Sequence, residues 1–383
     1  MKINNLDTRV FIEKLEMVGN SISNKSSNNT LLGVKINVME DKITLIGTDI
    51  ESAIKTTILK EELNSNSIAE IGTCLVDYKN FYTLISKLKC NKINLYTKDD
   101  KQLIVTNEDN VYKFNLISME EYPNIEFKKL DNELEITTEE LKKMIDKISY
   151  CCSTKENKPI LTGVNVKSNG TDNIECTATD SYHLARYTID CKTTNSFDLT
   201  IGKKSIVAIN KLANKTKQEK IKILYNNSNT DLMINIDNTL FKTRILEGRY
   251  PDTDRIVNIS GLYDYCINKN AFIESIDRIS TFSNTNDDVI KNSIIILSFE
   301  KSNLTIECEN QGKGQAKENI KVECLDSTES MKLACNGIFL MEALKKFNNA
   351  EIRITIADFN RPFLITSDDE NNNKQIVLPV KMQ

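Results

Sequence analysis

Apolar residues recur at helical spacing in three stretches of the chain. In the middle stretch, a stripe with the spacing i, i+3, i+4, i+7 predicts a helix over about 138–152, and Thr137 with Glu140 has the spacing of a capping box. The stripe consists of Leu141, Met144, Ile145 and Ile148. Matching stripes lie about 130 residues before and after it, and they consist of Phe11, Leu15 and Val18 and of Phe272, Ile276 and Ile279. The same helix is therefore predicted three times.

A pair of strands follows each of these helices. Alternating apolar residues on both sides of a Ser/Asn/Gly turn predict a strand pair over 159–186, which ends in a polar corner. The plan recurs over 31–52 and over 293–311. The corner residues are Thr179 with Asp180, then Thr48 with Asp49, and Asn310 in the third copy.

A second helix follows the strands in each copy, and further alternating strands follow that helix. A repeat of about 130 residues is a whole domain, because solenoid units have only about 20 to 50 residues. We therefore expect an α+β fold made of three tandem copies, each with two helices packed on antiparallel sheets and joined edge to edge. The second helices are predicted at about 77–89, 203–215 and 336–348, and the domains at 1–127, 128–254 and 255–383.

The overall charge gives no general attraction to nucleic acid. The 383 residues include 50 Lys and Arg against 54 Asp and Glu, a net charge of −4, so any DNA contact needs a local basic surface. The first residues lack the apolar core of a signal peptide, and no apolar run approaches about 18 residues. We expect a cytoplasmic protein that does not enter a membrane.

The ten cysteines do not form a pattern typical of a metal or disulfide protein. None belongs to a CxxC pair, and His183 is the single histidine. The pattern favours buried thiols in a reducing compartment. We expect no metal and no other cofactor.

Asp180, Ser181 and His183 suggest a hydrolase as one alternative. Adjacent residues rarely converge on one reacting atom, however, and no glycine-rich nucleophile elbow surrounds Ser181. His183 is therefore predicted to be a partly exposed surface residue, and the chain is predicted to have no catalytic residue.

Lysines gather on the second helix of each copy. From 199 to 218 the chain has five lysines and no acidic residue. A solvated face explains one such helix, but the recurrence on equivalent helices favours a shared surface that faces phosphate. The lysines predicted to face DNA are Lys25, Lys79, Lys87, Lys203, Lys204, Lys211 and Lys215.

Three short segments resemble signatures of one family. They are ATDSYHLA at 178–185, EGRYPD at 247–252 and LPVKM at 378–382. With the length, the three copies and the helix placement, the whole chain resembles the bacterial DNA polymerase III beta subunit family, the DNA sliding clamps. The resemblance implies a head-to-tail homodimer closed into a ring of six domains, with helices around duplex DNA and strands outside. It implies a non-catalytic processivity factor of DNA replication that binds DNA without sequence specificity.

The resemblance also implies a cleft that binds a peptide of partner proteins. Through it the replicative polymerase, the clamp loader and other proteins with a clamp-binding peptide would be recruited. His183 stands where relatives usually have arginine, which removes a permanent charge, and Gln383 lies one residue beyond the usual end. The cleft residues are Leu161, Thr179, Tyr182, Leu184, Pro251, Arg255 and Ile256 from the second copy and Asn336, Phe339, Pro362, Ile376, Leu378, Pro379 and Val380 from the third. The residues implied at the subunit interface are Phe114, Leu116, Thr281 and Phe282.

An interaction scaffold of the same domains that forms no ring is the main alternative. Its mass in solution would distinguish it, because the ring requires a dimer of twice the chain mass of 43.6 kDa.

Overall fold

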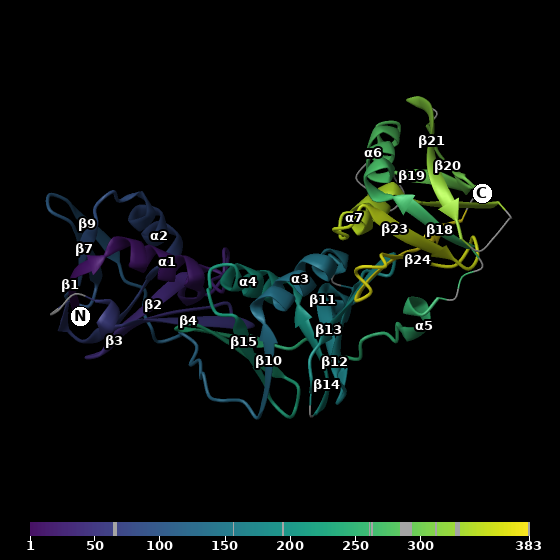
Figure 1. Ribbon diagram of the computed structural model, residues 1–383. Helices are drawn as coiled ribbons and strands as arrows, with labels where there is room; N and C mark the ends of the chain where they lie inside the picture. The colour runs from purple at the N-terminus through teal and green to yellow at the C-terminus, as the bar shows by residue number, and fades with distance from the viewer. Residues whose placement is uncertain are drawn as a thin grey trace. The chain divides into compact units, whose positions relative to one another are not determined.

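The computed structural model divides into two compact units of helices and antiparallel sheets (Figure 1). Unit 1 comprises 1–142 and 204–245, and unit 2 comprises 143–203 and 246–383. The described residues are 1–63, 67–155, 157–193, 195–259, 261, 263–283, 293–310, 312–325 and 330–381. Among them, no helix is long and apolar enough to span a membrane.

Unit 1 contains two antiparallel sheets. Their strand orders are β5-β1-β7-β8-β9 and β10-β15-β16-β17-β4-β3-β2-β6. The strands are β1 (Lys2–Asp7), β2 (Gly33–Val38), β3 (Lys42–Thr48), β4 (Ser52–Leu59), β5 (Ile68–Glu70), β6 (Gly72–Asp77), β7 (Lys92–Lys98), β8 (Gln102–Thr106), β9 (Val111–Asn115), β10 (Asn132–Thr137), β15 (Lys220–Tyr225), β16 (Asp231–Ile236) and β17 (Thr239–Arg244).

Unit 2 contains one long antiparallel sheet. Its order is β14-β11-β12-β13-β25-β24-β23-β18-β21-β20-β19-β22-β26. The strands are β11 (Gly163–Asn169), β12 (Asn173–Thr179), β13 (His183–Asp190), β14 (Ser196–Gly202), β18 (Tyr263–Asn268), β19 (Ile294–Phe299), β20 (Asn303–Asn310), β21 (Gly314–Cys324), β22 (Met331–Asn336), β23 (Glu351–Ile356), β24 (Phe363–Thr366), β25 (Asn373–Val377) and β26 (Pro379–Val380).

The predicted helices are present in all three copies. The first helices are α1 (Thr8–Gly19), α3 (Thr138–Ile148) and α6 (Lys269–Ser280), and the second are α2 (Tyr78–Lys87), α4 (Lys203–Ala213) and α7 (Gly337–Leu344). Shorter helical turns are η1 (Asn29–Leu32), η2 (Lys60–Glu62), η3 (Ser149–Cys151), η4 (Pro159–Thr162) and α5 (Asp254–Val257). Every residue of the three predicted stripes is buried. The expected α+β fold class is therefore confirmed.

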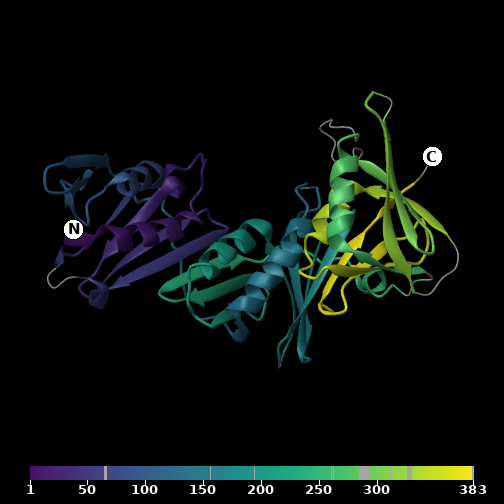
Figure 2. The ribbon, with the colours of Figure 1, turned by 45° about the horizontal axis from the view of Figure 1, so that its top comes forward.

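Helix starts and helix packing follow from local sequence. The Thr137 hydroxyl accepts a hydrogen bond from the Glu140 amide at 3.1 Å, which is one half of the predicted capping box. In unit 1, α1 lies beside α2 and over β3 and β4, and in unit 2 α6 lies beside α7 (Figure 2). The stripes of α1 and α6 thus pack against strands of their own units.

Strand pairing joins neighbouring copies edge to edge, as expected. In unit 1, β4 of the first copy pairs with β17 of the second, and we call this the first junction. In unit 2, β13 of the second copy pairs with β25 of the third, which is the second junction. Because unit 1 and unit 2 divide the middle copy between them, the domain limits near 127 and 254 stay predictions.

The strand pairs depart from prediction at their first residues. Leu31 and Leu161 lie in the turns η1 and η4, not in strands. The predicted third pair is β19 with β20, and Gln311 at its end lies outside the described residues, as does Gln383.

Candidate functional site

The polar corner between β12 and β13 is tied down by its own side chains. The Thr179 hydroxyl donates to the His183 carbonyl at 2.7 Å and accepts from the Ser181 amide at 3.1 Å. Asp180 Oδ1 accepts from the amides of Tyr182 at 2.8 Å and His183 at 3.0 Å. Ser181 adopts a positive φ of 81°, which few residues other than glycine take. The corner thereby fixes the start of β13.

His183 is buried, so the prediction of a partly exposed residue was wrong. Its Nδ1 lies 2.8 Å from Asp180 Oδ1, and its ring stacks on Phe339 with centroids 4.5 Å apart and planes at 8°. Its Nε2 has no hydrogen-bond partner among the described residues. No hydrogen bond therefore joins Ser181 to His183 within the described chain, and the hydrolase alternative gains no support.

Asp180 is an ionised anchor of this corner. Burial raises its pKa, but the hydrogen bond and charge of the His183 ring and the two backbone amides lower the pKa more, so it lies below its usual value. The carboxylate therefore keeps its charge at neutral pH, and it orients the imidazole.

Part of the predicted cleft forms an apolar cluster around Leu184. Leu184, Val257, Leu364 and Ile376 are buried together, and Ile256 packs against them half-buried. The cluster joins β13, β24, β25 and α5, and three of the predicted cleft residues meet here: Leu184, Ile256 and Ile376.

A second group of cleft residues is more open. Tyr182 and Leu378 are each 38% exposed, and the Leu378 amide donates to the Tyr182 carbonyl at 3.0 Å. The Tyr182 ring stacks on Phe339, with centroids 6.4 Å apart. Asn336 caps α7 by accepting from the Phe339 amide at 3.2 Å. This group therefore leaves apolar surface exposed.

The remaining cleft residues are placed around these groups. Leu161 and Thr179 are buried, Pro362 is half-buried, and Pro251 and Arg255 are exposed. Pro379 and Val380 form β26, which pairs with Cys335 and Ala334.

Arg186 positions residues of the predicted cleft, although sequence reasoning gave it no role. The guanidinium is buried and donates to the hydroxyls of Thr177 at 3.1 Å and Thr253 at 2.6 Å. It also pairs with Asp254 at 2.8 Å and Glu175 at 3.4 Å. Arg186 thus holds the start of α5 against β12 and β13, which brings Ile256 to Leu184. Arg186 directly follows the signature segment at 178–185, and no sequence pattern marked it as a residue of the site.

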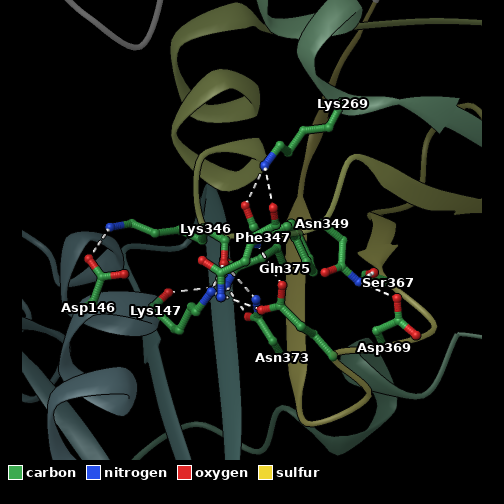
Figure 3. A network of polar contacts seen from close by, with 12 residues as sticks. Asp146, Lys147, Lys269, Lys346, Phe347, Asn349, Ser367, Asp369, Asn373 and Gln375 are labelled. Carbon is green, nitrogen blue, oxygen red and sulfur yellow. Dashed lines mark hydrogen bonds and ion pairs between the residues drawn. The ribbon is translucent and has the colours of Figure 1, made fainter. Parts of the chain in front are cut away.

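A buried polar network lies beside the second junction (Figure 3). Lys147 Nζ lies 2.9 Å from Glu370 Oε2 and donates to the Lys346 carbonyl. The Gln375 amide donates to the Lys147 carbonyl at 3.1 Å, and the Tyr150 hydroxyl donates to Gln375 Oε1 at 2.6 Å. The network ties α3 and η3 of the second copy to β25 and to the loop residues Lys346 and Glu370 of the third.

Six of the seven lysines predicted to face DNA are exposed, and Lys203 is half-buried. Three of them already have partners in unit 1: Lys204 pairs with Asp49, the Lys211 ammonium donates to Asn20 Oδ1 at 3.0 Å, and Lys215 pairs with Glu16 at 2.6 Å. No sequence pattern indicated these contacts.

The residues expected at the subunit interface lie at two separate places. Phe114 lies on β9, the edge strand of the five-stranded sheet, and its ring meets Phe81 edge-on at 5.4 Å. Leu116 follows this strand and forms a bridge to Val76. Thr281 is exposed directly after α6, and Phe282 packs half-buried on the core of unit 2.

The chain matches three family models in succession. They describe the DNA polymerase III beta subunit N-terminal domain over 1–126, the central domain over 135–252 and the C-terminal domain over 263–381. The beta sliding clamp of Bacillus subtilis is 26% identical over 375 residues, and that of Staphylococcus epidermidis is 27% identical over 376 residues. In both cases 97% of this chain and 97% of the relative are covered.

Solved structures agree over the full length. The crystal structure of a DNA polymerase sliding clamp from Bacillus subtilis superimposes with a TM-score of 0.91 at 25% identity. A DNA polymerase III beta subunit from Thermotoga maritima gives 0.90 at 17% identity, which shows the fold alone. Both cover 100% of this chain and of the other.

Proposed function

Because the chain belongs to the DNA polymerase III beta subunit family, we propose that two copies close head to tail into a ring around duplex DNA. It is a sliding clamp, a non-catalytic subunit of the replicative polymerase that acts in DNA replication. The ring holds DNA by enclosing it, and a diffuse lysine surface lets it slide, so base contacts are not needed. We place the protein in the cytoplasm and its three domains at 1–127, 128–254 and 255–383.

The proposal of a closed ring is supported mainly by the open edge of β9. An edge strand presents unpaired amides and carbonyls that a second chain can complete. Phe114 and Leu116 are half-buried in the single chain and so have apolar surface left to cover. We assign Thr281 and Phe282 to the opposite side of the same contact.

The experiment is a mass measurement during dilution. Wild type is expected at twice 43.6 kDa, and Phe114→Asp and Phe282→Asp are expected at the monomer mass. A carboxylate buried in an apolar contact costs on the order of several kcal/mol, which explains the loss. Val111→Asp, on the other face of β9, is the control and should keep the dimer. A monomeric wild type would favour the scaffold without a ring.

We assign partner binding to the two apolar groups around His183. The open surface of Tyr182, Leu378 and Phe339 suits an extended peptide with Leu or Phe anchors, and the Leu184 cluster forms its floor. The clamp loader, the replicative polymerase and other proteins with a clamp-binding peptide are the proposed ligands. The assignment is supported mainly by the backbone hydrogen bond from the Leu378 amide to the Tyr182 carbonyl, which brings two copies together at this surface.

Peptide affinity tests this assignment. Losing an aliphatic contact is worth about 1.5 kcal/mol or more, so Leu378→Ala should weaken a QLxLF-type peptide about tenfold. Leu184→Ala should weaken it as well, but Leu184 is only 4% exposed and its loss also destabilises the fold. Deleting 380–383, of which 382 and 383 lie outside the described residues, should weaken binding further. Unchanged affinity in all three variants would place the partner site elsewhere.

A further inference from the structure

The first junction repeats the geometry of the second. Ser52 and Ala53 pair with Thr243 and Lys242, just as His183 and Leu184 pair with Val377 and Ile376 at the second junction. The Arg244 amide donates to the Glu51 carbonyl at 2.9 Å, which is the counterpart of the bond from Leu378 to Tyr182. Arg244 therefore stands where Leu378 stands, and Lys242 stands where Ile376 stands.

The corner before β4 is also the same. The Thr48 hydroxyl donates to the Ser52 carbonyl at 2.8 Å and accepts from the Ile50 amide at 3.0 Å, and Asp49 Oδ1 accepts from the Ser52 amide at 2.7 Å. Ile50 has a φ of 80°, against 81° at Ser181. A β-branched residue in this region is a genuine outlier, and such strain concentrates at ligand sites.

A pocket of about 330 Å³ opens at the first junction, within unit 1. It is lined by the corner, by the segment 123–126 and by the ends of β16 and β17. Several lining residues are the repeat counterparts of predicted cleft residues: Thr48, Glu51, Ala53, Pro123, Asp231 and Lys242. The same folding plan thus places a ligand-sized hollow at the first junction, on residues equivalent to those of the predicted cleft.

The charges of this pocket differ from those of the apolar cleft. Lys242 forms an ion pair with Asp231, with 3.4 Å between Nζ and Oδ1. Glu126 forms an ion pair with Lys128, with 2.7 Å between Oε2 and Nζ. Arg244 is exposed, and its guanidinium has no ion pair within the described chain. Arg244 is therefore the cation left for a ligand, beside the apolar wall of Ile50.

We propose that this pocket is a second peptide-binding site, and that it takes an extended acidic segment of a partner protein. The guanidinium of Arg244 binds a carboxylate side chain of the segment, for which its planar fork is suited. An aliphatic side chain next to that carboxylate lies against Ile50 and Ile125. That the ligand is a peptide rests on the cleft proposed at the second junction, because the two sites share one backbone plan.

Glu51 should oppose the binding of an acidic segment, whereas Arg244 should favour it. Glu51 is exposed, without an ion pair in the described chain, and lines the same pocket, so it repels an acidic ligand. Arg244→Gln should weaken the acidic segment, and Glu51→Gln should strengthen it.

Fluorescence anisotropy with labelled peptides tests the proposal. The acidic probe is QIDEI, its neutral control is QINQI, and QLSLF is the probe for the second junction. The wild-type dimer should bind QIDEI about tenfold more tightly than QINQI, and Arg244→Gln should remove that difference. Leu378→Ala should weaken QLSLF and leave QIDEI unchanged. Hydrogen exchange should show QIDEI protecting 48–53 and 239–244.

The outcomes separate this inference from the proposed function. No binding of QIDEI at millimolar concentration, or equal affinity in Arg244→Gln, overturns the second site. If QIDEI instead protects 182–190 and is displaced by QLSLF, one cleft serves both peptides and the second site is also overturned. QLSLF that does not bind wild type would refute the proposed cleft, whatever QIDEI does.

Discussion

Replacing Lys147 with methionine should strongly destabilise the protein. The side chains of Lys147 and Glu370 are only 6% and 14% exposed, so solvent screens their attraction weakly. Glu370 Oε1 also accepts from the Asn348 amide at 2.6 Å, which fixes the carboxylate in place. In Lys147→Met this carboxylate stays buried without its cation. Removing one partner of a buried pair costs about 3 to 5 kcal/mol.

The dependence of stability on acid pH should show whether the charge of Glu370 causes the destabilisation of Lys147→Met. Burial raises the pKa of Glu370, but Lys147 and the amides of Asn348 and Asn349 lower it more, so the net pKa lies below its ordinary value. In wild type the resulting stability is complete above the ordinary glutamate pKa of about 4.3 and is lost as the pH falls through the lower folded pKa. In Lys147→Met the carboxyl protonates at higher pH, so the difference from wild type should shrink between neutral pH and about pH 4.

A double-mutant cycle in urea measures the pair. Glu370→Leu should also destabilise, because it leaves the ammonium of Lys147 buried, whereas Lys147→Met with Glu370→Leu should come within about 1 to 2 kcal/mol of wild type. Protein concentration must be equal throughout, since dimer formation adds stability by mass action. Lys128→Met is the control: its bond to Glu126 at 2.7 Å joins side chains that are 77% and 55% exposed, and it should change stability little.

Two results would contradict the reasoning. A loss in Lys147→Met no greater than in Lys128→Met would show that the pair is effectively solvated. A loss that does not change with pH would show that packing of the lysine stem, and not the carboxylate charge, is responsible.

Three further changes have distinct expected results. Changing Lys203, Lys204 and Lys211 to Glu should weaken binding to linear DNA without base preference and lower the slope of log affinity against log salt by up to about 3, and equal binding at low salt would make these lysines a solvated face. Ile50→Asn should raise the free energy of unfolding by about 1 kcal/mol, because asparagine tolerates a positive φ, and an unchanged urea midpoint would mean that the corner is not strained. Burial raises the pKa of Cys74 and Cys152 to about 12, so a thiol reagent at neutral pH should label native protein only at the four partly exposed cysteines, and fast labelling of a fifth would contradict the burial.

The helices could be predicted because their signal is local. The stripe around Leu141 and Ile145 needs only the neighbouring turns of the same helix, and its copies could be found by offset alone. The positions of the second helices followed in the same way. The 3-10 turns at Leu31 and Leu161 were missed because a single apolar residue before a strand shows no periodicity that would distinguish a turn from the strand itself.

The site depended on contacts that a single sequence does not encode. His183 is covered by Phe339, which is far away along the chain, so its burial could not be read from its neighbours. The partner of Lys147 lies 223 residues away, and on a helix of mixed charge its ammonium looked like any exposed one. Arg186 lies just beyond the signature segment at 178–185, and its partner Asp254 is far away along the chain. The family resemblance predicted which positions belong to the cleft, whereas the hydrogen bonds and ion pairs of these residues became known only from the structure.

Strand pairing at the second junction affects how clamps from different species can be combined. His183 pairs with Val377 and Tyr187 with Asn373, so β13 and β25 form one ladder built by two copies. A hybrid cut at the boundary near 254 would join foreign halves of this ladder and of the Lys147 network. In an isolated third copy, β25 would keep β24 as a neighbour but expose its other edge to solution, which favours aggregation. A grafted piece should therefore keep β13, β25 and the residues of the Lys147 network from one species, because these hydrogen bonds cross the boundary between two repeats.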